Sequence, residues 1–499
     1  MEPRPTGTVA LPEEGGRRAK SPGDPYSRKW LSLSVVAVGT FMSTLDSSIV
    51  NISLPAITDA LNTNLATVQW VVTAYMLTIT SLLLSFGRLA DIVGRKLVYT
   101  TGFAVFTVAS GLCGIAQTVE QLILLRALQG VGAAMVMAIS PAITASAFPP
   151  NERGKALGIN STVVATGSTL GPTLGGILIT FMDWRAVFFA RIPVGIIGVL
   201  LALVILREPT HHGQKQPFDL LGAILLSVGL TSLLLALNQG QQVSWLSPTT
   251  VTLFVLFATL LLAFLLQESR TAHPMLDLSL FRHRVFAAAN VSAMFSFVAS
   301  SGTIFLTPFL LVQILGVDPS RAGIVMTASP LTMAVVGPIS GWLSDRFGSR
   351  WLSSLGISIS CLGLVLMSRL GPGASIPSVM FSLAFMGFGG GLFQPPNNNA
   401  IMGSVSKERL GIAAGMLATM RNLGMALGVA LAGAAYSTRY AHYISGGSAA
   451  PSPGAALLAS AASFHDAYLV AAAFAAIGIF TSLVRGHDRP KPGRSASRP

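Results

Sequence analysis

The chain has 499 residues, of which 52% are hydrophobic and only 10% are charged, and its formal net charge is +13. Soluble domains carry about 25% charged residues, so this composition excludes a soluble globular protein, a disordered chain and a coiled coil. The two cysteines, Cys113 and Cys361, both lie in apolar runs and predict no disulfide framework. The remaining class is an all-α polytopic membrane protein.

Long uncharged stretches separate the charged residues along the chain. A membrane-spanning helix needs about 20 mainly apolar residues. The longest uncharged stretch lies between Asp219 and Glu268, and a polar segment at 238–242 divides it, so it predicts two helices. We therefore predict fourteen spans, near 31–57, 68–87, 97–116, 121–147, 156–181, 187–206, 220–237, 248–267, 285–313, 322–343, 351–369, 377–399, 410–436 and 466–484.

The Lys and Arg residues predict the orientation, because cytoplasmic loops of membrane proteins are enriched in them. With the amino terminus inside, 25 of the 32 fall on the cytoplasmic side, four in outer loops, and three within spans: Arg126, Arg191 and Arg421. We predict a multi-pass protein of the plasma membrane with both termini cytoplasmic. The positive charge thus reflects topology and not nucleic-acid binding, and the basic tails contact anionic lipid headgroups at most.

A short motif occurs twice. The pattern G-x-L-x-D-x-x-G, followed by basic residues, begins at Gly87 after the second span and at Gly341 after the tenth. This spacing predicts two six-helix halves related by duplication, which is typical of transporters. The expected organisation is a disordered tail (1–30), a first bundle (31–207), two inserted helices (218–267), a second bundle (285–484) and a second tail (485–499).

The repeated turn has the chemistry of a latch. Glycine allows sharp turns and close helix packing, and an Asp can cap a neighbouring helix N-terminus or pair with Arg. Such a contact can hold one conformation and release in the other; the alternative is an ordinary basic loop with an incidental Asp. We assign to the latch Gly87, Arg88, Asp91, Gly94, Arg95, Lys96 and Asp345.

Four segments together resemble the major facilitator superfamily, in its fourteen-helix drug:proton antiporter branch, over about residues 30–485. They are the first repeated turn, apart from Ile92, and the segments 45–55, 126–130 and 167–176. Arg191 departs from the pattern, since similar proteins commonly carry Asn there. The resemblance implies a major-facilitator-like fold of two six-helix bundles plus two additional central helices.

Asp46 is the only one of 19 acidic residues that lies deep within a span. It lies about 22 Å from the cytoplasmic end of its helix, and Arg126 about 8 Å from the outer end of another. The hydrocarbon core is about 30 Å thick, so a residue about 22 Å from its cytoplasmic side lies about 8 Å from its outer side. Asp46 and Arg126 therefore lie at a similar depth, and their side chains can pair directly or through water. Ionisable groups inside membranes are functional candidates. The resemblance assigns proton coupling to Asp46 and Arg126; the alternative is a structural ion pair.

The fifth span carries a stripe of glycines at helical spacing. Small residues at i, i+4 and i+8 allow close helix contact, and a proline inside a helix produces a kink. A kinked, closely packed span can seal one side of a transport path and favour exchange; the alternative is ordinary packing. The residues assigned to this antiporter span are Gly167, Gly171, Pro172, Gly175 and Gly176.

Several further polar and aromatic residues are candidates for lining a substrate cavity, although packing within a half or contact with lipid is the alternative for each. Arg191, in contrast, is expected near the outer surface with its charge extended toward the headgroups. The cavity candidates are Asn51, Gln129, Phe305, Phe309, Gln394, Asn397, Asn398 and Arg421.

These features predict a secondary active exporter that exchanges protons for amphipathic or cationic drug-like compounds by alternating access, as in multidrug efflux and antibiotic resistance. The alternatives are export of one endogenous metabolite or lipid, and a non-transporting sensor. No H-E-x-x-H, Walker A or paired-acid motif is present, so we predict no enzyme, no metal and no cofactor. The expected partners are small substrates, protons and the lipid bilayer, with the monomer as the functional unit.

Overall fold

The computed structural model describes residues 28–63, 65–207, 217–242, 244–271, 274–445 and 453–485. The predicted disordered tails therefore lie almost wholly outside the described residues. The elements are α1 (Lys29–Ala60), α2 (Leu65–Val93), α3 (Arg95–Gly114), α4 (Val119–Ala147), η1 (Pro150–Glu152), α5 (Arg153–Phe181), α6 (Ala186–Phe189), α7 (Arg191–Ile205), α8 (Leu220–Gln242), α9 (Pro248–Arg270), η2 (Leu278–Arg282), α10 (Arg284–Phe309), η3 (Leu310–Ile314), α11 (Pro319–Met326), α12 (Ala328–Phe347), α13 (Ser349–Ser368), α14 (Ile376–Gly403), η4 (Lys407–Arg409), α15 (Leu410–Ser445) and α16 (Pro453–Val484).

The prediction of fourteen spans is confirmed. Fourteen helical segments within the described ranges are long and apolar enough to cross a membrane. Five spans contain two elements each. In three of them α6 continues into α7, α10 into the π-helical turn η3, and α11 into α12, and in the other two a short 3-10 turn, η1 or η4, precedes α5 or α15. The uncharged stretch after Asp219 forms two helices, α8 and α9, as its polar interruption predicts.

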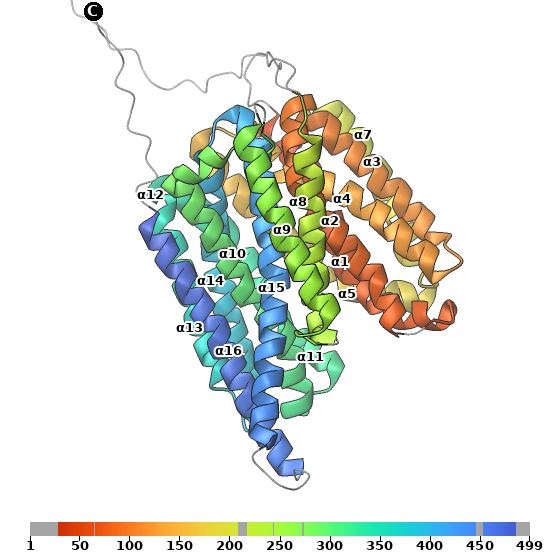
Figure 1. Cartoon of the computed structure of the whole chain (residues 1–499), viewed down its shortest axis with the longest axis vertical. Coiled ribbons are helices and arrows are strands. Elements are labelled where there is room, and N and C mark those ends of the chain that lie inside the picture. The colour runs from red at the N-terminus through yellow and green to blue at the C-terminus, as the bar shows by residue number, and fades with distance from the viewer. Residues whose placement is uncertain are drawn as a thin grey trace, which may run out of the picture.

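Two groups of helices form the molecule, with an inserted pair between them in the sequence. Helices α1 to α7 pack on one another, as do α10 to α16, and α8 packs on both α2 and α15. Figure 1 shows α8 and α9 in front of the junction between the two groups. Helix α9 packs mainly on α8 and is largely exposed, as expected for a helix that faces lipid.

Hydroxyl groups join the inserted pair to the first half. The Ser227 hydroxyl donates to the Ser81 carbonyl oxygen at 3.0 Å, and the hydroxyls of Ser81 and Thr231 lie 2.7 Å apart. Apolar side chains of α8 and α9 also pack around Ala430 of α15. The inserted helices therefore contact both halves, and any relative movement of the halves has to be accommodated by α8.

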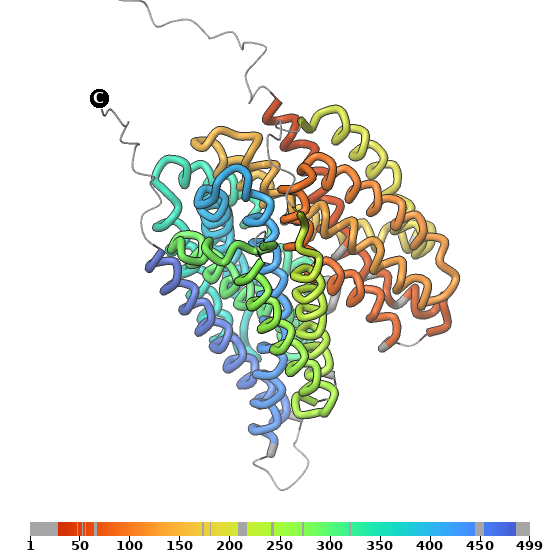
Figure 2. Tube along the Cα trace, turned by 45° about the horizontal axis from the view of Figure 1, so that its top comes forward, coloured from red at the N-terminus to blue at the C-terminus, as the bar shows by residue number. Residues whose placement is uncertain are grey.

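Hydrogen bonds and close glycine contacts between the two halves gather at one end of the bundle. There α2 crosses α15 and α5 crosses α12, with glycine against glycine at each crossing. We call this the latch end; it lies at the top of Figure 1, and Figure 2 brings it forward. The helices of the two halves diverge from it toward the opposite end.

Candidate functional site

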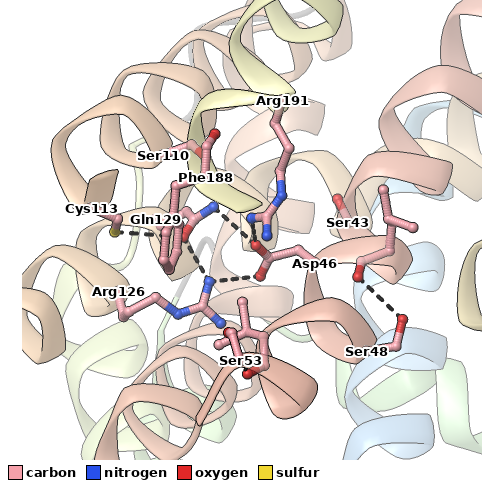
Figure 3. A network of polar contacts seen from close by, with 12 residues as sticks. Ser43, Asp46, Ser48, Ser53, Ser110, Cys113, Arg126, Gln129, Phe188 and Arg191 are labelled. Atoms are coloured by element: carbon pink, nitrogen blue, oxygen red, sulfur yellow. Dashed lines mark hydrogen bonds and ion pairs between the residues drawn. The ribbon is translucent and has the colours of Figure 1, made fainter. Parts of the chain in front are cut away.

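A buried carboxylate lies inside the first half, where α1, α4 and α7 meet. Asp46 lies in the middle of α1 and Arg126 near the start of α4. The two side chains meet, as their predicted common depth in the membrane allows. Arg191 is the first residue of α7, immediately after the break at Ala190 that separates α6 from α7. The three charged side chains converge between these helices (Figure 3).

Four side chains form a closed polar network. Arg126 Nη1 donates to Asp46 Oδ2 and to Gln129 Oε1, both at 2.7 Å, and Gln129 Nε2 donates to Asp46 Oδ1 at 3.2 Å. Arg191 Nη1 forms an ion pair with the same Asp46 Oδ1. Arg126 Nε also donates to the Val71 carbonyl oxygen at 3.1 Å, which fixes the guanidinium against α2. The pairing of Asp46 with Arg126 is therefore direct.

The network is sealed from solvent and carries excess positive charge. Asp46, Arg126 and Gln129 have no exposed surface, and Arg191 is 2% exposed. Aromatic faces cover the cations: the Arg126 guanidinium lies 4.0 Å from the centre of the Tyr75 ring. Two guanidinium groups thus face one carboxylate. Both cations stabilise the charged form of this carboxylate.

The expectation that Arg191 extends to the outer surface is wrong. Its side chain points inward and binds Asp46, because the cost of burying the cation is offset by the carboxylate beside it. The sequence contained a signal for this. Arg191 lies about as many residues inside the outer end of its span as Arg126 does, so the depth comparison that linked Arg126 to Asp46 applied equally to Arg191.

Replacing Arg191 by Asn should move the pH dependence of transport toward higher pH. The change removes one of the two cations that stabilise the charged form of Asp46, so a proton competes for the carboxylate at lower proton concentration. Arg126 and Gln129 still bind Asp46, so the protein should remain folded. The measurement is transport rate against pH in proteoliposomes, with Arg185→Asn, a change in an exposed ion pair, as the control. An unchanged profile would show that Arg191 has no part in proton binding.

The first copy of the repeated turn joins the two halves. Asp91, near the end of α2, accepts hydrogen bonds from the backbone N–H groups of Gly411 and Ile412, both at 2.9 Å. These groups lie in the first turn of α15, where the helix dipole favours an anion. Arg95 donates to Asp91 Oδ1 at 3.0 Å and also to the Lys407 carbonyl oxygen. Asp91 therefore caps a helix of the opposite half.

The second copy repeats this contact in reverse. Asp345, near the end of α12, accepts hydrogen bonds from the N–H groups of Gly154 at 2.8 Å and Lys155 at 3.0 Å, in the first turn of α5. Asn399 Nδ2 adds a bond to Asp345 at 3.2 Å, a contact that the sequence did not suggest. Each half thus caps one helix of the other half, which makes the latch symmetric.

Not every residue assigned to the latch lies in it. Lys96 donates to the Leu203 carbonyl oxygen at 2.7 Å and stays within the first half, so its assignment is corrected. Arg88 lies near three carboxylates: Asp91, Glu268 at the end of α9, and Asp277 in the loop that follows α9. Gly94 has φ of 109°, a left-handed conformation that glycine adopts without strain, and it makes the turn between α2 and α3.

Replacing Gly87 by Ala should weaken the latch. A Cβ atom there would lie 2.5 Å from the Gly411 carbonyl oxygen and 3.2 Å from Gly415 Cα, so α2 and α15 would have to separate. Overpacking of this kind costs about 1–3 kcal/mol. Spin labels at Val93 and Phe347, exposed on the first and second halves, should report a longer distance. Gly403→Ala is the control, because a Cβ there meets nothing within 4 Å; equal distances in both variants would contradict the prediction.

The glycine stripe of α5 faces α1. A Cβ at Gly167 would collide with Thr44, one at Gly171 with Ser48, and one at Gly175 would lie 2.8 Å from Ile49. The stripe therefore brings α5 against the helix that carries Asp46. Gly176 points elsewhere, since a Cβ there meets nothing within 4 Å. Helix α5 is continuous through position 172, and the side chain of Pro172 lies outside the described residues.

The candidate cavity residues do not form one group. Asn397 is wrongly assigned: it is fully buried, donates to the Ala289 carbonyl oxygen at 3.1 Å and accepts from Arg485 at 3.2 Å. Gln129 is also fully buried and belongs to the Asp46 network. Asn51 is exposed on α1; the half-buried or exposed candidates of the second half are Phe305, Phe309, Gln394, Asn398 and Arg421. The rings of Phe305 and Phe309 contact each other in a tilted arrangement, with 5.5 Å between their centres.

The described residues contain no group of three or more His, Cys, Asp or Glu side chains placed to hold a metal ion. The chemistry of the site is instead that of an ion network and a conformational contact. It contains one buried carboxylate held by two cations, and two helix caps that join the halves at the latch end.

Comparisons with known proteins agree with these features. The family model of the Major Facilitator Superfamily matches residues 36–288 and 289–499. The chain is 38% identical over 404 residues to the riboflavin transporter RibZ of Clostridioides difficile, covering 81% of this chain and 87% of that protein. It is 34% identical over 404 residues to the multidrug resistance protein Stp of Mycobacterium tuberculosis, covering 81% and 75%.

Two further comparisons point the same way. The multidrug transporter MdtP of Bacillus subtilis is 32% identical over 416 residues, covering 83% of this chain and 76% of that protein. The crystal structure of the human organic anion transporter MFSD10 superposes with a TM-score of 0.65 at 17% identity, over 91% of this chain and 99% of that one. At this identity the superposition shows a shared fold.

Proposed function

This chain belongs to the Major Facilitator Superfamily, whose members are membrane transporters and not enzymes, and from that premise we propose that it is a proton-coupled exporter. It exchanges protons for amphipathic, drug-like compounds by alternating access. The proton gradient drives it without a cofactor, it works as a monomer in the plasma membrane, and both termini lie in the cytoplasm.

The observation that carries the proposal is the Asp46 network. Asp46 is fully buried in the first half and is held by Arg126 and Arg191. A carboxylate whose cations lie on two other helices changes its proton affinity when those helices move, and this couples proton binding to conformation. Since both of its oxygens are already bound, Asp46 serves the proton and not a cationic substrate.

The two caps supply the conformational part of the cycle. They close the latch end by binding Asp91 to α15 and Asp345 to α5. With both termini in the cytoplasm, the latch end is cytoplasmic and the conformation described here opens outward. Inward opening breaks both caps, and the Asp46 network then exchanges its proton on the other side.

Reconstituted protein tests the proposal. Proteoliposomes with an imposed pH gradient would be supplied with a cationic dye, a neutral amphipathic dye and riboflavin, and substrate and proton movements would be recorded together. We expect transport that stops when a protonophore collapses the gradient, with substrate-induced proton flux in the opposite direction. Transport that persists with the protonophore would contradict antiport, and no movement of any compound would favour a sensor.

A second candidate is transport of one endogenous compound. The observation in its favour is the 38% identity to a protein named as a riboflavin transporter, over 87% of that protein's length. A single saturable substrate in the panel, with no competition from the dyes, would favour this function. Mutual competition among chemically different compounds would favour multidrug export.

A further inference from the structure

Two carboxylates lie at the latch end of the inserted helices. Asp219 directly precedes α8 and caps it, since its Oδ1 accepts from the Gly222 N–H group at 2.8 Å. Glu268 lies in the last turn of α9, and its Oε2 accepts from the Leu276 N–H group at 3.0 Å. Each carboxylate is thus bound through one oxygen. The other oxygens, Asp219 Oδ2 and Glu268 Oε1, are buried and have no hydrogen-bond partner among the described residues.

The two unbound oxygens point at the same small space. A Cβ atom on Gly222 would lie 2.7 Å from Asp219 Oδ2 and 2.9 Å from Glu268 Oε1. Glycine leaves that position open, so both oxygens border one cradle that a single methyl group would fill. Glu268 is only 4% exposed, and water is therefore largely excluded from its carboxyl group.

No cation within the described residues forms an ion pair with either carboxylate. Arg88 of α2 is the nearby positive charge, but it also faces Asp91, Asp277 and Arg409. Two ionised carboxylates that share a buried space repel each other and lose their hydration. One shared proton removes one charge and gives each unbound oxygen a hydrogen-bond partner.

We propose that Asp219 and Glu268 share one proton and form a second proton-binding site, which makes closure of the latch sensitive to pH at that end of the protein. A proton fits the cradle better than a metal ion, because the described residues offer no third His, Cys, Asp or Glu ligand there. The proposal does not depend on proton coupling at Asp46.

A short loop connects this pair to the latch. Glu268 holds the backbone of Leu276, and the next residue, Asp277, forms an ion pair with Arg409 at 2.6 Å. Arg409 ends the turn η4, which leads directly into α15, and the first N–H groups of α15 bind Asp91. The carboxyl pair therefore supports the loop that holds the start of α15.

The direction of the pH effect follows from charge. When the proton leaves, two like charges remain in one buried space, and their repulsion favours separation of the start of α8 from the end of α9. The packed arrangement binds the proton more tightly than the separated one, so its stability is present at lower pH and is lost as pH rises. Alkaline pH at the latch end should therefore loosen the loop and open the latch.

Infrared spectroscopy of the purified full-length protein tests the shared proton directly. A protonated carboxyl group has a C=O stretching band apart from those of carboxylates and amides. We expect such a band in the wild type, sensitive to exchange into D2O, and we expect Glu268→Gln and Asp219→Asn each to remove or shift it. Asn is also a good N-cap, so Asp219→Asn preserves the start of α8. A band unchanged in both variants would overturn the proposal.

Asp277 provides the matched control. Burial alone would raise its pKa, but hydrogen bonds from Ser279 and the Arg409 cation together lower the pKa of Asp277 below its ordinary value. It therefore stays ionised, and Asp277→Asn should leave the band in place. The titration would be repeated with sodium replaced by a bulky organic cation. A band that depends on sodium would overturn the proton assignment in favour of a bound cation.

Distance measurements test the link to the latch. In protein labelled at Val93 and Phe347, raising the pH through the titration of the infrared band should lengthen the distance between the labels. Glu268→Gln is neutral at every pH and should keep the short distance throughout, and Asp219→Asn should reduce the change. Equal pH-dependent opening in the wild type and in both variants would show that the pair does not act on the latch.

Discussion

Replacing Asp46 by Asn is expected to reduce proton-driven export to the level of protein-free liposomes. The variant removes the only carboxylate of the network and leaves Arg126 and Arg191 buried without a counter-charge. Loss of one partner of a buried ion pair costs about 3–5 kcal/mol. The substitution should therefore also lower the thermal unfolding temperature, a stability loss that the sequence alone did not predict.

A second variant separates the loss of chemistry from the loss of stability. Asp46→Asn combined with Arg191→Asn retains one excess positive charge, as in the wild type, and should recover part of the unfolding temperature. Export should remain absent, because no group in the network can exchange a proton. Recovery of proton-driven export in the double variant would show that the coupling carboxylate lies elsewhere.

Replacing Asp91 by Asn is expected to shift the protein away from the state with a closed latch end. The amide can accept from only one of the two N–H groups of α15 and loses the charge that pairs with Arg95. A hydrogen bond to a charged group contributes about 1.5–3 kcal/mol. Turnover should slow while substrate affinity within each state stays the same, and labels at Val93 and Phe347 should report the opening.

Asp345→Asn tests the symmetry of the latch. The sequence of the second copy departs further from the repeated motif, which predicts a weaker effect, but Asp345 caps α5 through two N–H groups as Asp91 caps α15. The third partner differs: Asp91 forms an ion pair with Arg95, whereas Asp345 accepts a bond from the neutral Asn399 amide. We therefore expect a clear but smaller opening from Asp345→Asn and a larger one from the double variant.

A control at the opposite end completes this test. Asp183 lies in an exposed turn and pairs loosely with Arg185 at 3.4 Å, so Asp183→Asn should leave the distances unchanged. Unchanged distances in Asp91→Asn together with lost transport would place the role of Asp91 in insertion or folding instead.

Both effects depend on contacts between helices that are far apart in the sequence. The Asp46 network is assembled from α1, α4 and α7, and the α5 glycine stripe packs against the same α1. Helix α5 is also the helix that Asp345 caps. When the latch end moves, α5 moves with it, and because α5 packs on α1 this movement can displace Asp46 relative to its cations.

The sequence by itself determined the number of spans, the duplicated turn and the depth of the charged residues. Hydrophobicity and helix rise are local properties, so the position of Asp46 and Arg126 along the membrane normal followed from counting residues. The chemistry of the latch also followed, because an Asp before a basic turn has few roles other than helix capping and ion pairing.

Only the tertiary structure decided which side chains meet. Counting gives depth but not the rotation of a helix about its axis, nor its neighbours. The sequence therefore predicted Arg191 near the surface and Asn397 in a cavity, whereas in the structure Arg191 pairs with Asp46 and Asn397 binds Arg485. The sequence likewise did not show which helices Asp91 and Asp345 cap. Each caps a helix of the opposite half, and packing between elements far apart in the sequence determines which helix that is.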